Sequence, residues 1–155
     1  MSRSTLLLVA LILPVVISTR WVRLNLSPSV PVGLYWLSAV PVEVPRGARV
    51  MLPVPASIHH LWPRWVPLLK PVAGIPGDMV CHQEGRLQVN TVDYGPVYHT
   101  AHNRPLPHPD TGCEVVPEGR VLLASPVPKS LDGRYFGLTA VDTLTASATP
   151  LVTWR

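Results

Sequence analysis

Two residues of the chain combine a reactive side chain with a restricted setting: a serine between prolines and a lysine within an apolar run. Ser29 lies between Pro28 and Pro31, whose rings restrict the local backbone before folding. Lys70 follows two leucines and precedes Pro71, which favours extended backbone at the lysine. Burial in such a strand would lower the pKa of the amine from about 10.4 toward neutrality, and a neutral amine can deprotonate a serine hydroxyl. Considered separately, an ordinary turn at Ser29 and an exposed edge lysine both stay open.

A third segment, residues 130–137, places an acid and a base two positions apart. On extended chain, Asp132 and Arg134 would point to the same side and could pair. Such a pair can brace a strand near a site. It can equally be a solvated surface bridge that contributes about 0–1 kcal/mol.

The elements that must position these residues are short strands separated by proline and glycine. The 19 prolines exclude long helices, since each removes a donor and clashes with the preceding turn. Apolar runs rich in valine, leucine and aromatic residues predict strands at 33–37, 48–52, 68–72, 79–81, 86–90, 120–124 and 151–154. We therefore expect a mostly β protein, with antiparallel sheets wrapped into a small barrel-like body and residues 82–115 as a loop-rich insertion.

The N-terminal segment predicts a membrane anchor. Residues 5–18 are uncharged and mostly apolar, and extension through Trp21 and Val22 brings the run near the about 20 residues of a bilayer span. No convincing cleavage site follows, so we expect an uncleaved anchor at 1–22 and one folded domain at 23–155. A buried strand or helix is the alternative, and the flanking charges do not decide the orientation.

Composition narrows the class of protein. A chain of 155 residues suits one core, and 47% hydrophobic against 14% charged residues excludes a disordered chain. The net charge of +4 is scattered along the chain, whereas nucleic-acid binding concentrates basic residues, so we expect no nucleic-acid partner.

The cysteines and histidines suggest no metal site or other cofactor. Cys81 and Cys113 would be buried thiols in a reducing compartment and a disulfide in an oxidising one. His99 and His102 could share a metal, but the chain has no HExxH and no CxxC motif. The six histidines are His59, His60, His82, His99, His102 and His108.

Taken together, these segments resemble the three catalytic boxes of the type I signal peptidase clan, most closely its conjugative-transfer (TraF-type) branch. The residues that carry the resemblance are 29–36, Lys70 with 74–78, 132–137 and the closing Thr153-Trp154. Gly133 stands where ordinary signal peptidases usually carry serine, which points to the transfer branch. Pro71 stands where the family often has a basic residue, so Lys70 must depend more on burial for a low pKa.

The resemblance implies catalytic roles for Ser29, Lys70 and Asp132, and oxyanion or supporting roles for Ser27, Ser130 and Arg134. Ser29 is the expected nucleophile and Lys70 the general base. Ser27 falls where the clan has a hydroxyl that stabilises the oxyanion, and the backbone N–H of Ser29 would be the second donor.

The other three of these residues belong to the third segment, 130–137. Ser130 falls where the clan has a serine that orients the lysine amine. Asp132 falls where the transfer peptidases need an acid, and Arg134 is its expected partner. The implied fold is the signal-peptidase-like antiparallel β body with one N-terminal transmembrane helix.

The resemblance also implies partners and a location. We expect a membrane-anchored serine endopeptidase at the bacterial inner membrane, with its catalytic domain in the periplasm, acting on a secreted, pilin-like precursor. The acyl-enzyme would be resolved by water or by a substrate amine that closes a ring, and both outcomes remain open. The alternatives are a housekeeping signal peptidase and a non-catalytic anchored β scaffold of a secretion apparatus. We expect the side chains of Trp62 and Trp65 either to contact membrane lipid or to pack in the core.

Overall fold

The computed structural model describes residue 5 and residues 20–154. The predicted anchor at 1–22 therefore lies almost wholly outside the described residues. Within them, no helix combines the length and apolar character needed to cross a bilayer. Val22 already belongs to the first strand, and Trp21 stacks on Trp36 with ring centroids 5.8 Å apart.

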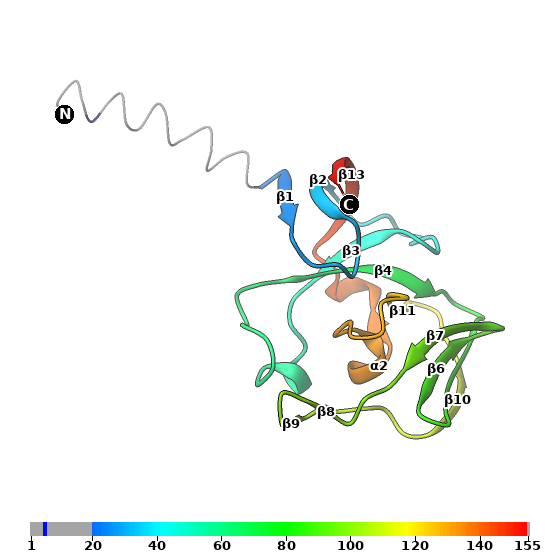
Figure 1. Cartoon of the computed structure of the whole chain (residues 1–155). Coiled ribbons are helices and arrows are strands. Elements are labelled where there is room, and N and C mark those ends of the chain that lie inside the picture. The colour runs from blue at the N-terminus through cyan, green and yellow to red at the C-terminus, as the bar shows by residue number, and fades with distance from the viewer. Residues whose placement is uncertain (1–4, 6–19, 155) are drawn as a thin grey trace.

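A seven-stranded antiparallel sheet forms the larger part of the body (Figure 1). In spatial order its strands are β1 (Val22–Asn25), β2 (Val32–Ser38), β13 (Ala146–Trp154), β3 (Arg49–Leu52), β4 (Leu68–Gly74), β11 (Arg120–Leu123) and β12 (Thr139–Ala140). The strands β1 and β12 form the two edges of this sheet.

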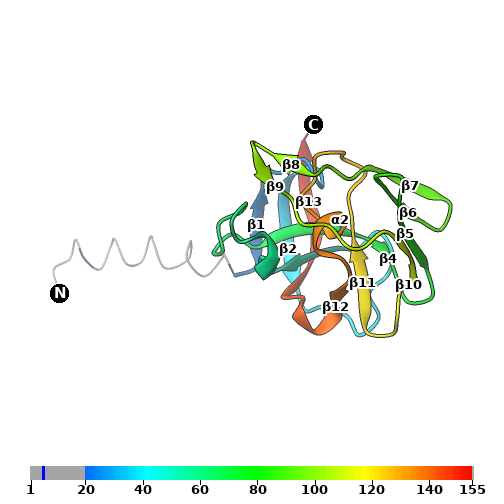
Figure 2. The same ribbon diagram turned by 90° about the horizontal axis from the view of Figure 1, so that it is seen from below.

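A smaller sheet lies on the side of the body away from β1 and β2 (Figures 1 and 2). Its strands, in order, are β10 (Gly112–Val115), β5 (Met79–Gln83), β6 (Arg86–Val89) and β7 (Val92–Pro96). A separate hairpin joins β8 (Thr100–Ala101) to β9 (Arg104–Pro105). The described helices are short: η1 (Ala56–Ile58), α2 (Gly133–Phe136) and η2 (Val141–Thr143).

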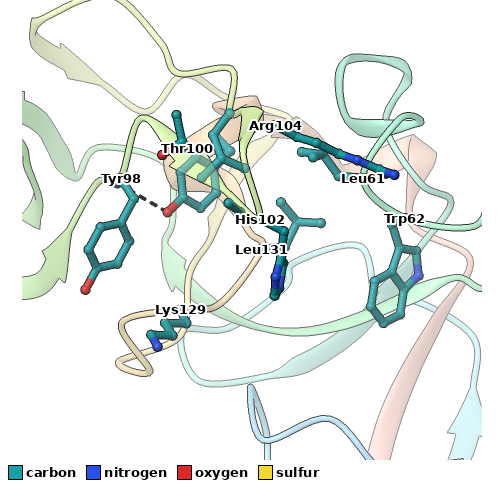
Figure 3. A pocket seen from close by; sticks show the side chains of 11 residues that line it. Leu61, Trp62, Tyr98, Thr100, His102, Arg104, Lys129 and Leu131 are labelled. Atoms are coloured by element: carbon teal, nitrogen blue, oxygen red, sulfur yellow. Dashed lines mark hydrogen bonds between the residues drawn. The ribbon is translucent and has the colours of Figure 1, made fainter.

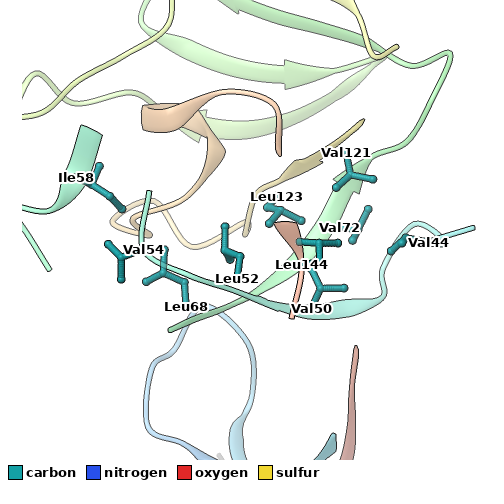
Figure 4. Packing of buried hydrophobic residues seen from close by; sticks show 10 residues of the cluster. All are labelled: Val44, Val50, Leu52, Val54, Ile58, Leu68, Val72, Val121, Leu123 and Leu144. Carbon is teal, nitrogen blue, oxygen red and sulfur yellow. The ribbon is translucent and has the colours of Figure 1, made fainter. Parts of the chain in front are cut away.

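The strand β4 is apolar at nearly every position because both of its faces are buried in the core. Side chains alternate between the two faces of a strand. Val72 of β4 packs with the cluster around β3 and β11 that Figure 4 shows, whereas Ala73 packs with the cluster that joins the two sheets. Leu123 and Leu122 of β11 divide in the same way. Both faces of these central strands are therefore buried.

The predicted mostly β, antiparallel fold is confirmed, and each of the seven predicted strands overlaps an observed one. Residues 82–115, which we expected to be a loop-rich insertion, contain β6, which matches the strand predicted at 86–90, and the strands β7, β8, β9 and β10, which were not predicted. These strands are two to five residues long, and several are polar or contain proline. Apart from β6, these strands carry too little apolar alternation to be recognised from sequence.

Candidate active site

The structure brings Ser29 and Lys70 together although 41 residues separate them in the chain. Ser29 lies in the loop between β1 and β2, and Lys70 lies in β4. The amine Nζ of Lys70 donates a hydrogen bond of 2.7 Å to Ser29 Oγ. Both residues are buried, with 7% of Ser29 and 4% of Lys70 exposed. A nucleophile and a base in hydrogen-bond contact and shielded from water meet the geometric requirement for nucleophilic catalysis.

The alternation of β4 explains the burial of Lys70. The lysine shares a strand face with Leu68 and Val72, which both belong to the largest core cluster. Burial is the main cause that lowers the pKa of Lys70 from the usual 10.5 to about 8. The negative charge of Asp132 works against this lowering, and the positive charge of Arg134 adds to it.

Ser130 completes a triangle of polar atoms with these two residues. Its Oγ lies 3.1 Å from Ser29 Oγ and accepts a hydrogen bond of 3.1 Å from Lys70 Nζ. Ser130 is buried and sits on a turn in which its N–H donates to the carbonyl of Val127. The hydroxyl therefore holds the amine at the place where it faces Ser29.

Asn25, at the end of β1, shapes the loop that carries Ser27 and Ser29. Its role was not predicted from the sequence. Its Nδ2 donates to the carbonyls of Ser27 (2.7 Å), Val30 (3.3 Å) and Pro31 (3.2 Å). Its Oδ1 accepts from the N–H of Ser27. An asparagine just before a Ser-Pro-Ser turn is a recognisable Asx-turn signal.

This loop places Ser27 against Ser29. Ser27 Oγ donates to Ser29 Oγ over 3.2 Å and accepts a long bond of 3.4 Å from the backbone N–H of Ser29. A contact of that length is weak. The two expected oxyanion donors therefore lie side by side next to the nucleophile.

Contrary to our expectation of extended chain through both residues, Arg134 lies in the short helix α2, whereas Asp132 itself has an extended backbone. It is the N-cap of the short helix α2, and its carboxylate accepts from the backbone N–H of Arg134. Its other hydrogen bonds come from the N–H of Ser125 and from the Arg134 guanidinium. The surface-bridge alternative is also excluded, because Asp132 and Arg134 are both 0% exposed.

Arg134 uses its guanidinium to hold three segments together. It donates to the carbonyls of Ser125, Pro128 and Pro96 in addition to Asp132. Two of these carbonyls belong to the loop that leads to Ser130, and the third ends β7. The buried pair therefore supports the position of Ser130, and the structure shows no direct hydrogen bond from this pair to Ser29 or Lys70 among the described residues.

Two glycines allow close backbone packing around the site. A Cβ atom on Gly33 would clash with the carbonyl oxygen of Val152 in β13, the strand that pairs with β2. A Cβ atom on Gly133 would lie 2.7 Å from the carbonyl oxygen of Leu123. Any side chain at Gly133 would therefore push α2 away from β11.

An open cleft of about 510 Å³ gives access to Ser29 and Lys70. Its walls come from the 23–29 segment, the 66–70 segment and the 127–131 loop. Trp62 also lines this cleft, whereas Trp65 is 83% exposed, so core packing is excluded for Trp65.

The cysteines pair outside this cleft. Cys81 of β5 and Cys113 of β10 face each other across the strand pair and form a disulfide with an S–S distance of 2.03 Å. Among the described residues, no group of three or more metal-ligating side chains exists. The ring nitrogen Nδ1 of His99 lies 3.3 Å from Nε2 of His108.

One protein family and several known proteins are similar to this chain. The family described as "Signal peptidase, peptidase S26" matches residues 2–154. The chain is 31% identical over 152 residues to a plasmid transfer protein TraF of Escherichia coli, covering 85% of this chain and 83% of the relative. It is 31% identical over 151 residues to a conjugal transfer protein TraF of Agrobacterium tumefaciens (strain 15955), covering 86% and 83%. A crystal structure of a signal peptidase I from Enterococcus faecalis V583 is similar with a TM-score of 0.41, at 20% identity, over 68% of this chain and 96% of that one.

The family match extends over almost the whole chain, and the two relatives are aligned over most of their own length. The protein therefore belongs to the signal peptidase family, and it is a serine-type peptidase.

Proposed function

We propose that the protein is a membrane-anchored Ser/Lys endopeptidase that cuts a secreted precursor polypeptide, with Ser29 as nucleophile and Lys70 as general base. The observation that carries this proposal is the buried 2.7 Å contact between Lys70 Nζ and Ser29 Oγ. It is supported by the lowered pKa of the Lys70 amine, which has burial as its main cause.

The chemistry follows from the positions of these groups. Neutral Lys70 takes the proton of Ser29 Oγ as this oxygen attacks the scissile carbonyl carbon. The N–H of Ser29 and the hydroxyl of Ser27 stabilise the oxyanion. The charged amine then protonates the leaving amine, which departs and leaves an acyl-enzyme on Ser29. Water or a second amine then attacks the ester and releases Ser29.

The lowered pKa makes this mechanism effective near neutral pH. With a pKa of about 8, roughly one Lys70 amine in ten is neutral at pH 7. With the usual value of 10.5, fewer than about one in a thousand would be neutral. Burial therefore increases the active fraction by about 300-fold.

The similar relatives support a finer proposal about the substrate and the location. Because they are named plasmid and conjugal transfer proteins, we infer a pilin-like precursor as substrate. Residues 1–22 would anchor the enzyme in the bacterial inner membrane, with residues 23–155 in the periplasm. In that setting the acyl group passes either to water or to an amine of the same precursor, which closes a ring.

Co-expression of the full chain with a candidate pilin precursor, followed by mass spectrometry of the pilin, tests this function. Wild-type protein should shorten the precursor, and Ser29→Ala or Lys70→Ala should leave it intact. Ser57→Ala, an exposed serine of η1, is the matched control and should process normally. A shortened product that lacks one further water indicates ring closure, whereas a free carboxyl end indicates hydrolysis.

Two outcomes would contradict the proposal. Processing at the wild-type rate by Ser29→Ala would exclude the assigned nucleophile. Cleavage of general secretory signal peptides without action on pilin would instead identify a housekeeping signal peptidase.

A further inference from the structure

A second hollow, of about 740 Å³, opens beside the cleft that contains Ser29 (Figure 3). Three separate segments form its walls: residues 61–62, the stretch 98–106 with the β8–β9 hairpin, and the stretch 129–135. Apolar and aromatic side chains supply most of the lining. The mechanism proposed above assigns no role to this hollow.

The charged groups around the hollow share one sign. Arg104 and Lys129 contribute exposed cations, and His102 adds an imidazole. None of the described residues that line the hollow is acidic. Such a lining favours a ligand with a carboxylate next to apolar groups.

The hairpin that supplies two of these groups is held in a defined place. His102 and Asn103 form its tip with φ of 48° and 60°, a left-handed conformation in which histidine is uncommon. The Arg104 guanidinium donates over 2.8 Å to the carbonyl of His60, and the His60 ring lies 3.1 Å from the carbonyl of Pro105. The hairpin is therefore tied to the segment that begins at η1, and Arg104 keeps further N–H donors for a ligand.

The hollow is continuous with the catalytic cleft. Trp62, Lys129 and Leu131 line both. Lys129 also directly precedes Ser130, whose hydroxyl contacts Ser29 and Lys70. A polypeptide whose scissile bond lies at Ser29 can therefore extend into the hollow without leaving the surface of the protein.

We propose that this hollow is a specificity subsite that binds an acidic segment of the substrate polypeptide, close to the bond that is cut. Arg104 and Lys129 lie on opposite sides of the hollow (Figure 3), so each pairs with a separate carboxylate position of the segment, and the aromatic wall packs against the neighbouring apolar side chain. The inference rests on the proposed function, because the proposed catalytic serine defines where the substrate lies.

Binding to the full-length Ser29→Ala protein in detergent tests the subsite without any need for cleavage. The probe is a short fluorescein-labelled peptide of alanine and serine with one glutamate, which is moved position by position, and a matched series carries glutamine instead. At the best positions the glutamate peptide should bind about three- to fivefold more tightly at low salt, as exposed ion pairs allow. Added salt should weaken this preference, because it screens exposed charges.

Charge reversal identifies the groups responsible. Arg104→Glu with Lys129→Glu should abolish or invert the preference for glutamate. Arg120→Glu makes the same charge change at an exposed residue outside the hollow and should keep the preference. If the double variant unfolds, Lys129→Glu alone, which changes an exposed loop residue, should still reduce the preference.

Three results would overturn the inference. The first is equal affinity for the glutamate and glutamine peptides at every position. The second is an unchanged preference in the folded charge-reversed protein. The third is that charge reversal abolishes binding to vesicles with anionic lipid while the peptide preference persists, which would assign the cations to the membrane.

Cleavage assays separate this inference from the proposed function. Wild-type enzyme should show a lower KM for the glutamate peptide at a similar kcat, because the contact binds ground state and transition state alike. Equal cleavage of both peptides overturns the subsite but leaves the peptidase proposal intact. Selective binding without any cleavage, even of a pilin precursor, refutes the proposed peptidase function while the subsite stands.

Discussion

Replacement of Lys70 by methionine should make the protein more stable at neutral pH while it abolishes catalysis. The buried amine has a pKa of about 8 in the folded protein, below its usual 10.5, with burial as the main cause. The unfolded chain therefore holds more protons between these two values, and folding becomes more favourable as the pH rises through this window. Methionine has a similar length and carries no charge to desolvate.

The magnitude follows from the two pKa values. The difference between 10.5 and about 8, at about 1.4 kcal/mol per unit, corresponds to roughly 3 kcal/mol of destabilisation at pH 7. The lost hydrogen bonds to Ser29 and Ser130 offset part of the gain, at about 1 kcal/mol each. Lys70→Met should therefore raise the free energy of unfolding by about 1–3 kcal/mol at pH 7. At pH 9.5 this difference from wild type should be smaller by about 2 kcal/mol than at pH 7.

Urea unfolding of the full chain in detergent, at both pH values, measures this difference. Other titrating groups affect wild type and variant alike, so the difference between the two proteins isolates Lys70. Lys129→Met, at an exposed position, is the control and should change stability by less than about 0.5 kcal/mol at either pH. A Lys70→Met protein less stable than wild type at pH 7, or an advantage that does not shrink with pH, would refute the assignment of a desolvated amine.

Three further predictions concern the same site. The kcat/KM of wild-type enzyme should rise about tenfold from pH 7 to pH 9 as Lys70, with a pKa of about 8, becomes neutral; a flat profile would exclude it as the base. Asp132→Ala should lower the free energy of unfolding by about 3–5 kcal/mol, since it leaves the Arg134 charge buried without its partner; a loss below about 1 kcal/mol in urea unfolding would contradict this. Gly133→Ala should destabilise by about 1–3 kcal/mol despite a better helix propensity, because its Cβ meets the Leu123 carbonyl; a higher melting temperature would disprove the clash.

Local sequence patterns were sufficient for β2, β3, β4, β11 and β13 of the larger sheet and for the residues expected to react. Val50, Leu68 and Leu123 belong to apolar runs between prolines and glycines, and burial of such runs is a local property of composition. Ser29 and Lys70 stood out because proline neighbours and an apolar setting are visible along the chain itself. Ser27 and Ser130 were assigned to the site only because they match positions of the family motifs.

The strands β7, β8, β9 and β10 and the capping role of Asp132 could not be predicted in the same way. Two-residue strands such as β8 and β9 exist because their hairpin is tied to the segment that begins at η1, through Arg104 and His60. Asp132 caps a helix of only four residues, which no periodicity reveals. These elements depend on contacts with distant segments and not on their own propensity.

The sequence by itself determined which residues are the candidates for the chemistry, which apolar runs become strands and that the body is β. Only the tertiary structure decided that the hydroxyl of Ser29, the amine of Lys70 and the hydroxyl of Ser130 converge, although the first and last are 101 residues apart. The physical reason is that the register of β4 and the burial of both its faces depend on packing against residues from many other segments of the core. The desolvation that lowers the pKa of Lys70 is therefore a property of the assembled protein and not of any segment.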